Sequence, residues 1–206
     1  MDRLDDIFDD ATEPASYARK YLDFLSRVLG RIDTGSIARF VELLLDARER
    51  GAAIFFIGNG GSAATASHFA NDIAVGTRPK DKPFRALSLT DNVAVLTAIG
   101  NDHGYDEIFV RQLRAHMRPG DVVVAISASG NSANVVKAIE YANANEGVTV
   151  ALTGFDGGRL REAARYDVHV PTHKGEYGPV EDAHMVLDHL VASYLIRHLQ
   201  AAGERE

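Results

Sequence analysis

Short continuous apolar segments alternate with amphipathic segments along most of the chain. In residues 15–29 and 36–50, apolar residues recur three and four positions apart, which predicts a pair of antiparallel helices. Apolar runs typical of buried strands then alternate with predicted helices; these runs are residues 54–57, 84–89, 122–126, 148–152 and 167–170. Continuous apolar strands separated by helices are typical of a parallel sheet covered on both faces. We therefore predict an α/β fold preceded by helices.

Three helix boundaries can be predicted from local signals. Ser62 follows a glycine-rich turn and is a good N-cap for the next helix. The segment from Gly100 to Gly104 is expected to break the helix before it, because it combines glycine, Asn and Asp. A long apolar helix is expected over residues 180–199.

Composition narrows the class of protein. The chain has 206 residues, 46% of them hydrophobic, which suits one domain over residues 1–206. The formal net charge of -7 argues against nucleic acid as the main partner. No cysteine is present, so thiolate catalysis is excluded. We expect a cytoplasmic protein with no membrane partner, since no apolar run approaches the ~20 residues of a membrane span.

Two strands end in turns rich in small and hydroxyl-bearing residues. The first turn is Gly58-Asn59-Gly60-Gly61-Ser62, and the second runs from Ser127 to Ser132 and includes Ser129. Ligands of parallel sheets bind at the carboxyl ends of strands, and helix N-termini favour anions, so the two turns predict a site for a phosphate monoester. The alternative is that they are ordinary capped turns. Neither turn matches a Walker A loop or the dinucleotide-binding fingerprint.

Four residues on two predicted helices could act together. His68 and Asp72 are four apart, while Glu181 and His189 are eight apart, so each pair lies on or near one helix face. Two imidazoles and two carboxylates suit Zn²⁺ or another divalent ion, and they equally suit proton transfer. The alternative is that the histidines are structural and the carboxylates form a solvated face.

Together the motifs resemble the sugar isomerase (SIS) domain family and, within it, the phosphoheptose isomerases. They occur in family order over nearly the whole chain: Gly58–Ala64, His68–Ala70, Leu96–Asp102, Gly120–Asp121, Ser127–Ser132, Leu152–Gly158 and Glu181–His184. The resemblance implies a three-layer sandwich with a five-stranded, parallel, flavodoxin-like sheet. It also implies a homotetramer built with residues 1–50, a core in residues 51–206, and sites completed by a neighbouring subunit.

The resemblance further implies interconversion of D-sedoheptulose 7-phosphate and D-glycero-D-manno-heptose 7-phosphate through an enediol, toward bacterial surface heptoses. Asp72 and His189 are then the catalytic residues. One zinc ion per subunit is expected on His68, Asp72, Glu181 and His189. The implied substrate-binding residues are Asn59, Gly60, Ser62, Asp91, Asn101, Asp102, Ser127, Ser129, Ser132 and Glu181.

Several positions depart from the commoner family pattern. Asp72 stands where Glu is usual, and Glu181 stands where Gln is frequent, which adds a carboxylate to the implied metal site. Ala128 replaces a Thr of the phosphate turn. Three alternatives stay open: an isomerase for another ketose phosphate, a non-catalytic SIS protein that binds the replication initiator, and a regulatory sugar-phosphate-binding domain.

Overall fold

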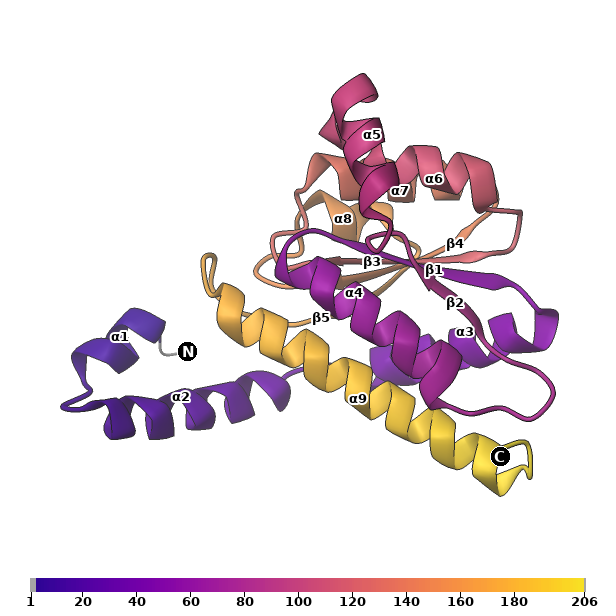
Figure 1. The fold of residues 1–206 in the computed structure, drawn as a ribbon. Coiled ribbons are helices and arrows are strands. Elements are labelled where there is room, and N and C mark those ends of the chain that lie inside the picture. The colour runs from indigo at the N-terminus through magenta and orange to yellow at the C-terminus, as the bar shows by residue number, and fades with distance from the viewer. Residues whose placement is uncertain (1–2, 206) are drawn as a thin grey trace.

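The computed structural model describes residues 3–205 and has one sheet of five parallel strands. The strands are β1 (Ala53–Gly58), β2 (Arg85–Ser88), β3 (Val122–Ser127), β4 (Val148–Thr153) and β5 (Tyr166–His169). Their spatial order is β2-β1-β3-β4-β5 (Figure 1). The predicted flavodoxin-like order and the α/β class are therefore confirmed.

Helices cover both faces of the sheet, as Figure 1 shows. One face carries α3 (Thr34–Arg50), α4 (Gly61–Asn71) and α9 (Tyr177–Ala201), and the other carries α6 (Ile108–His116), α7 (Ala133–Ala144) and α8 (Gly158–Ala163). Successive strand residues point to opposite faces. Accordingly Phe56 joins the core under α4 and α9, while Phe55 joins the core on the other side.

Helices α4 and α9 run side by side in the same direction (Figure 1). Phe69 of α4 is fully buried between two aromatic rings, stacked on Phe40 at 5.8 Å and edge-on to Phe56 at 5.0 Å. These contacts fix α4 against α3 and β1. Because Phe69 directly follows His68, the same packing fixes where the His68 side chain leaves the helix.

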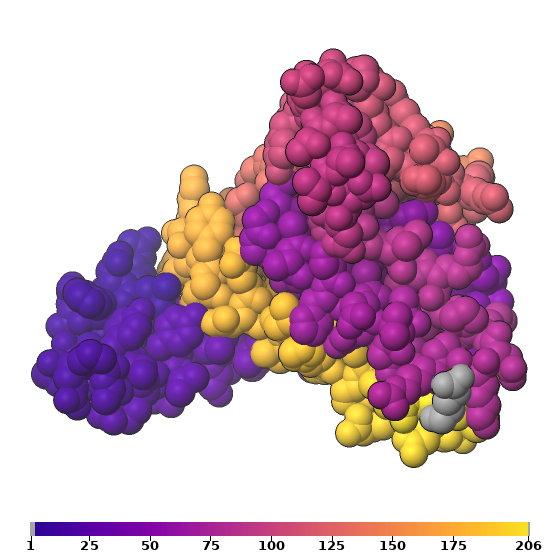
Figure 2. All heavy atoms as spheres, in the orientation of Figure 1, coloured from indigo at the N-terminus to yellow at the C-terminus, as the bar shows by residue number. Residues whose placement is uncertain are grey.

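The N-terminal helices form an arm beside this body. They are α1 (Leu4–Asp9) and α2 (Pro14–Leu29), and Figures 1 and 2 show them projecting to one side. The base of the arm is attached to α9, where the Tyr21 hydroxyl donates a hydrogen bond of 2.5 Å to Asp182. Burial and the neighbouring Asp182 carboxylate raise the pKa of Tyr21, so the phenol keeps its proton at neutral pH.

Several predicted boundaries differ from the structure. The last helix, predicted over residues 180–199, begins at Tyr177 and ends at Ala201. The N-cap of α4 is Gly60 rather than Ser62, and its φ of 53° and ψ of -124° suit glycine alone. Helix α5 (Val93–His103) continues through Gly100 and ends at Gly104, because Gly is tolerated inside a helix at a modest cost. After Asn71 the chain continues as a π-helical turn over Asp72–Gly76, an irregularity often found at functional sites.

Two further outcomes complete the comparison with the sequence. In residues 3–205, no helix has both the length and the apolar character that a membrane crossing requires. The acidic N-terminal segment forms a helix over Leu4–Asp9. The predicted domain covers residues 1–206, of which residues 1, 2 and 206 lie outside the described part.

We expect Phe69→Ala to lower the free energy of unfolding by about 3–5 kcal/mol, because it removes a buried ring and leaves a cavity. Chemical denaturation followed by circular dichroism measures this loss. Leu87→Ala is the control, since Leu87 is 57% exposed on β2 and its truncation should cost less than about 1 kcal/mol. Equal losses in both variants would contradict the central role of Phe69.

Candidate active site

A pocket of about 250 Å³ lies at the carboxyl ends of β1 and β3. These two strands are neighbours, and the chain leaves them in opposite directions to form the rest of the sheet. Such a switch point is where open α/β sheets bind ligands. The two predicted turns meet there, and the pocket is lined by Asn59, Gly60, Gly61, Ser62, Ile126, Ser127, Ala128, Ser129, Ser132, Tyr177 and Glu181.

The first turn is held rigidly by an amide network. The side-chain amides of Asn59 and Asn134 exchange two hydrogen bonds of 2.9 Å. The Tyr105 hydroxyl donates a third, also of 2.9 Å, to the side-chain Oδ1 of Asn59. Gly58 packs so closely that a Cβ there would lie 2.6 Å from the Ser62 carbonyl oxygen. The Asn59 amide is therefore occupied in fixing the turn, and the backbone of Gly60 and Gly61 faces the pocket.

The second turn brings hydroxyl groups and a helix N-terminus to the same pocket. Ser127 is buried and its hydroxyl accepts a hydrogen bond of 3.1 Å from the Gly130 backbone N–H. Ser132 is the N-cap of α7, but its side chain makes no capping hydrogen bond, so its hydroxyl is not used by the helix. With Ser62 in the first turn of α4, two positive helix ends converge here, as an anion site requires.

Glu181 lies in this pocket, the one predicted to bind phosphate. A methyl group on Gly61 would collide with the Glu181 carboxylate, and Glu181 lines the pocket. Glycine at position 61 therefore gives room for the carboxylate. In this chain Glu181 is placed beside the phosphate turn rather than among the residues that gather around His68.

The structure brings together His68, Asp72, Asp188 and His189, with one ligand atom of each within 4.8 Å of the others. The Nε2 atoms of His68 and His189 lie 3.3 Å apart. His68 Nε2 is 3.5 Å from Asp72 Oδ2 and 4.0 Å from Asp188 Oδ2. Three of the four predicted metal ligands thus converge, and Asp188 stands in the place expected for Glu181.

Asp188 was not singled out from the sequence. It is 0% exposed, and within residues 3–205 neither carboxylate oxygen has a hydrogen-bond partner. Burial, and to a smaller extent the Asp72 carboxylate, raises the pKa of Asp188 to about 8. The available signal was its spacing: Asp188 follows Glu181 by seven residues, two helical turns, on the face that also buries Val180, Leu187 and Val191.

Three predicted substrate-binding residues lie outside the pocket of their own chain. Asp91 accepts a hydrogen bond from the Ser67 hydroxyl. Asn101 and Asp102 are exposed near the end of α5, where the Asn101 amide donates to Asp102 at 2.8 Å. None of the three lines the pocket, so their role in binding stays a prediction.

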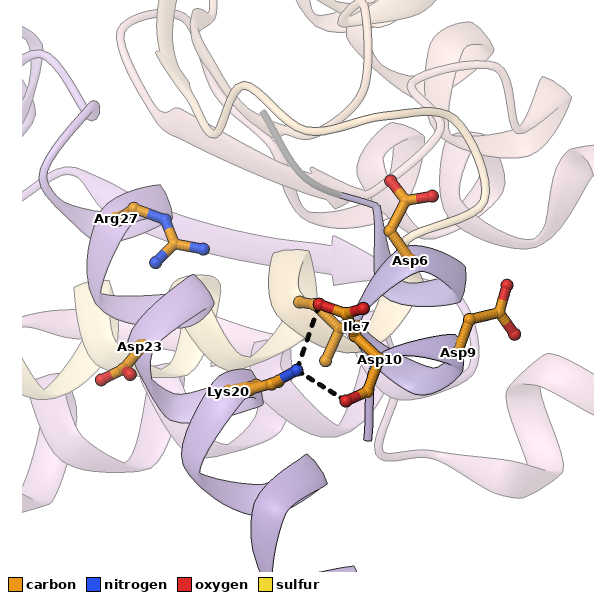
Figure 3. A pocket seen from close by; sticks show the side chains of 7 residues that line it. All are labelled: Asp6, Ile7, Asp9, Asp10, Lys20, Asp23 and Arg27. Carbon is orange, nitrogen blue, oxygen red and sulfur yellow. Dashed lines mark hydrogen bonds and ion pairs between the residues drawn. The ribbon is translucent and has the colours of Figure 1, made fainter. Parts of the chain in front are cut away.

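A larger hollow, of about 530 Å³, lies between α1 and α2 (Figure 3). Four Asp residues line it, and the Lys20 ammonium donates to the Asp10 carbonyl oxygen at 2.8 Å and to its carboxylate at 3.3 Å. The excess of carboxylates would repel a phosphate group. The smaller pocket at β1 and β3 is therefore the better candidate.

The comparisons with known proteins agree with this geometry. The SIS domain family matches residues 16–154. The phosphoheptose isomerase of Geobacter sulfurreducens is 39% identical over 193 residues, which span 94% of this chain and 99% of that protein. The chain belongs to the phosphoheptose isomerase family of SIS-domain proteins. The phosphoheptose isomerase of Bordetella avium is 43% identical over 155 residues, covering 74% of this chain and 78% of its own.

A solved structure supports the same family. The phosphoheptose isomerase from Neisseria gonorrhoeae superimposes with a TM-score of 0.79 at 33% identity, over 89% of this chain and 98% of that one. The family predicted from the motifs is therefore confirmed, and so is its fold.

His184 lies on α9 between the two ends of the site but is buried, and burial lowers its pKa to about 4. It is therefore neutral in the folded state, whereas an exposed histidine titrates near 6.5. As the pH falls, His184 is therefore protonated in the unfolded chain at a higher pH than in the folded chain. Stability from neutral His184 is present above pH 6.5 and is lost progressively down to about pH 4.

We expect the free energy of unfolding to fall more steeply from pH 6.5 to pH 4 in the wild type than in His184→Gln, by on the order of 3 kcal/mol. Urea titrations at several pH values measure the difference. His116→Gln, at the exposed end of α6, is the control and should follow the wild-type curve. Parallel curves for the wild type and His184→Gln would contradict a buried neutral imidazole.

Proposed function

We propose that the chain interconverts D-sedoheptulose 7-phosphate and D-glycero-D-manno-heptose 7-phosphate. The observation that carries the proposal is the pairing of α4 with α9. Their N-terminal ends meet at the phosphate pocket through Gly61 and Glu181, and their middles meet through His68 and His189. Seven residues of α4 separate the two places, about 10 Å along the helix. That separation suits a sugar with a phosphate at one end and a carbonyl at the other.

The phosphate end would hold the substrate by its anionic group. Ser62, Ser127, Ser129 and Ser132 supply hydroxyl donors, and the N-termini of α4 and α7 supply backbone N–H groups. Such contacts stabilise the bound substrate and the transition state equally, and they position the carbonyl end of the sugar for reaction. Glu181, Asn101 and Asp102 are proposed to recognise sugar hydroxyls, the last two from a neighbouring subunit.

The His and carboxylate group would perform the proton transfers. Asp72 takes a proton from C1 of the ketose, the electron pair forms the C1–C2 double bond, and the carbonyl oxygen becomes an enediol oxygen. Return of the proton to C2, with loss of the O1 proton, gives the aldehyde. His189 would move the proton between the two oxygens, as a general acid and base.

The residues present fit a divalent metal ion. Two imidazoles and two carboxylates within 4.8 Å form a donor set suited to Zn²⁺, and the buried Asp188 oxygens lack any other partner in the described chain. We propose one zinc ion per subunit. When bound, it would supply a Lewis acid that polarises the substrate carbonyl and stabilises enediolate charge.

A homotetramer is proposed as the working form. Helix α5, Val93–His103, has apolar residues on several sides but no residue fully buried within the described chain, and only its Leu96 and Ile99 pack partly against the core. An apolar hollow of about 310 Å³ between α3 and α9 is bordered by Leu190 and Tyr194, both exposed. Apolar surface of this extent is typical of subunit contacts. The projecting arm formed by α1 and α2 is proposed to take part, in line with the role predicted for residues 1–50.

Two other functions remain testable alternatives. A regulatory sugar-phosphate-binding domain needs the phosphate pocket, but neither it nor a non-catalytic protein that binds the replication initiator needs the group of two imidazoles and two carboxylates. The proposed reaction belongs to heptose synthesis for surface glycans such as lipopolysaccharide, capsule or S-layer glycan. It would take place in the cytoplasm.

We expect the protein to convert sedoheptulose 7-phosphate to the aldose and to incorporate solvent deuterium at C2, because an enediol exchanges its proton with water. Proton NMR in D₂O measures both, with fructose 6-phosphate and ribulose 5-phosphate as competing substrates. Asp72→Asn and His189→Ala should lose at least about 100-fold in kcat, as expected for removal of a general acid or base.

His198→Ala, a second histidine on α9, is the matched control and should keep wild-type activity. Conversion without deuterium incorporation would argue against the enediol. Wild-type turnover in both Asp72→Asn and His189→Ala would contradict the assignment of those residues, and absence of conversion of all three ketose phosphates would contradict the proposed function.

We expect a native mass of about four times the chain mass of 22.3 kDa. Leu190→Glu should shift the mass downward, because it places a charge in an apolar contact. Size-exclusion chromatography with light scattering measures this. Arg197→Glu, also on α9 but hydrogen-bonded within its own helix to Ser193, is the charge-changing control. A monomeric wild type would contradict the tetramer.

A further inference from the structure

Asp188 is an unusual carboxylate for a folded chain. It is completely buried in the middle of α9, and its two oxygens have no hydrogen-bond partner among residues 3–205. Buried carboxyl oxygens without hydrogen-bond partners cost free energy whether the group is protonated or charged, and proteins normally pair such a group or give it a metal. The Asp188 oxygens therefore need a binding partner that the described protein groups do not supply.

The surroundings of Asp188 indicate which partner is missing. Around it stand His68, His189 and Asp72, each with a ligand atom within the same 4.8 Å. Ligand atoms of a tetrahedral zinc ion, at about 2.0–2.1 Å from the metal, lie about 3.3 Å from each other. Around His68 Nε2, the separations of 3.3 Å to His189 and 3.5 Å to Asp72 are close to that value, and Asp188 Oδ2 lies somewhat farther away, at 4.0 Å.

We propose that Asp188 is a metal ligand in this chain, where the family pattern would place Glu181, and that Glu181 instead serves the phosphate end of the site. The inference deepens the proposed function, since it concerns the metal of the same active site. What is new is the exchange of one ligand for another along α9.

The geometry of α9 supports the exchange. Glu181 precedes His189 by eight residues, about 12 Å along the helix axis. Side chains on a helix lean toward its N-terminus, so Glu181 leans away from His189. Its carboxylate already contacts the Gly61 position. Asp188 directly precedes His189, and although adjacent helix side chains point in different directions, a ligand atom of each lies in the same cluster as His68 and Asp72.

The exchange also gives Glu181 a separate task. Its carboxylate lies in the phosphate pocket, next to the N-terminus of α4. A carboxylate interacts favourably with that positive end when no substrate is bound. On substrate binding it must turn toward the sugar hydroxyls, because it would repel the phosphate. Glu181 is thus expected to affect substrate affinity and not metal affinity.

The first experiment compares zinc binding by the wild-type chain with zinc binding by two variants of the full chain. Asp188→Asn should lower zinc affinity at least about tenfold, and Glu181→Gln should change it less than about threefold. Metal-free protein is titrated with zinc in competition with a chromophoric chelator. Zinc should raise the melting temperature of the wild type and of Glu181→Gln, and raise that of Asp188→Asn much less, because a ligand stabilises the state that binds it.

The absence of cysteine makes a direct test of ligation available. In Asp188→Cys loaded with Co²⁺, a thiolate bound to the metal should produce a near-ultraviolet charge-transfer band. Glu181→Cys is the matched control and should produce none. No other residue of the chain can give this band, so it reports ligation at the substituted position even if Asp188→Asn folds poorly.

A thiolate band in Glu181→Cys, loss of zinc in Glu181→Gln, or wild-type zinc affinity in a folded Asp188→Asn would overturn the inference. Failure of the wild type to bind any divalent metal would also overturn it. The proposed function fails separately, if zinc binds as expected but sedoheptulose 7-phosphate is not converted.

Discussion

The parallel packing of α4 against α9 is the constraint on which the site depends. It is set by apolar contacts, with Phe69 between Phe40 and Phe56 and with Leu187 and Val191 of α9 in the same core. Because neither helix can slide without opening that core, residues far apart in sequence keep a fixed spacing. The phosphate turn and the imidazole group are two points along one rigid pair of helices.

The fixed spacing along α4 and α9 keeps the pocket at the turns after β1 and β3 apart from the group around His68 and His189, and the two places have different requirements. Anion binding depends on backbone N–H groups, so the turns after β1 and β3 tolerate little variation in shape; Gly60 adopts a conformation that other residues avoid. In the proposed reaction, proton transfer depends on side chains that change charge. Their position about two turns along α4 would keep them out of the strongest field of the helix N-terminus.

The sequence predicts most of this organisation but not all of it. The parallel sheet, the two Ser-rich and Gly-rich turns and the pairing of His68 with Asp72 follow from local patterns and helix periodicity, whereas the flavodoxin-like strand order follows only from the family resemblance. The contribution of Asp188 was not predicted, because its spacing from Glu181 indicates a shared helix face but not whether that face is buried in the core. The placement of Glu181 could not be predicted either, since it depends on the space left by Gly61, a residue of another helix.

The burial of Asp188 has a thermodynamic consequence for the metal-free protein. An unpaired carboxylate beneath His68 and beside Asp72 destabilises the apo fold, and its raised pKa expresses that cost as a preference for the protonated form. If a divalent cation binds as proposed, it would remove the cost by supplying the missing charge. Stability and ion binding would then be linked at this position, because the same group weakens the empty site and strengthens the occupied one. Such linkage is typical of residues that a fold retains for chemistry at the expense of stability.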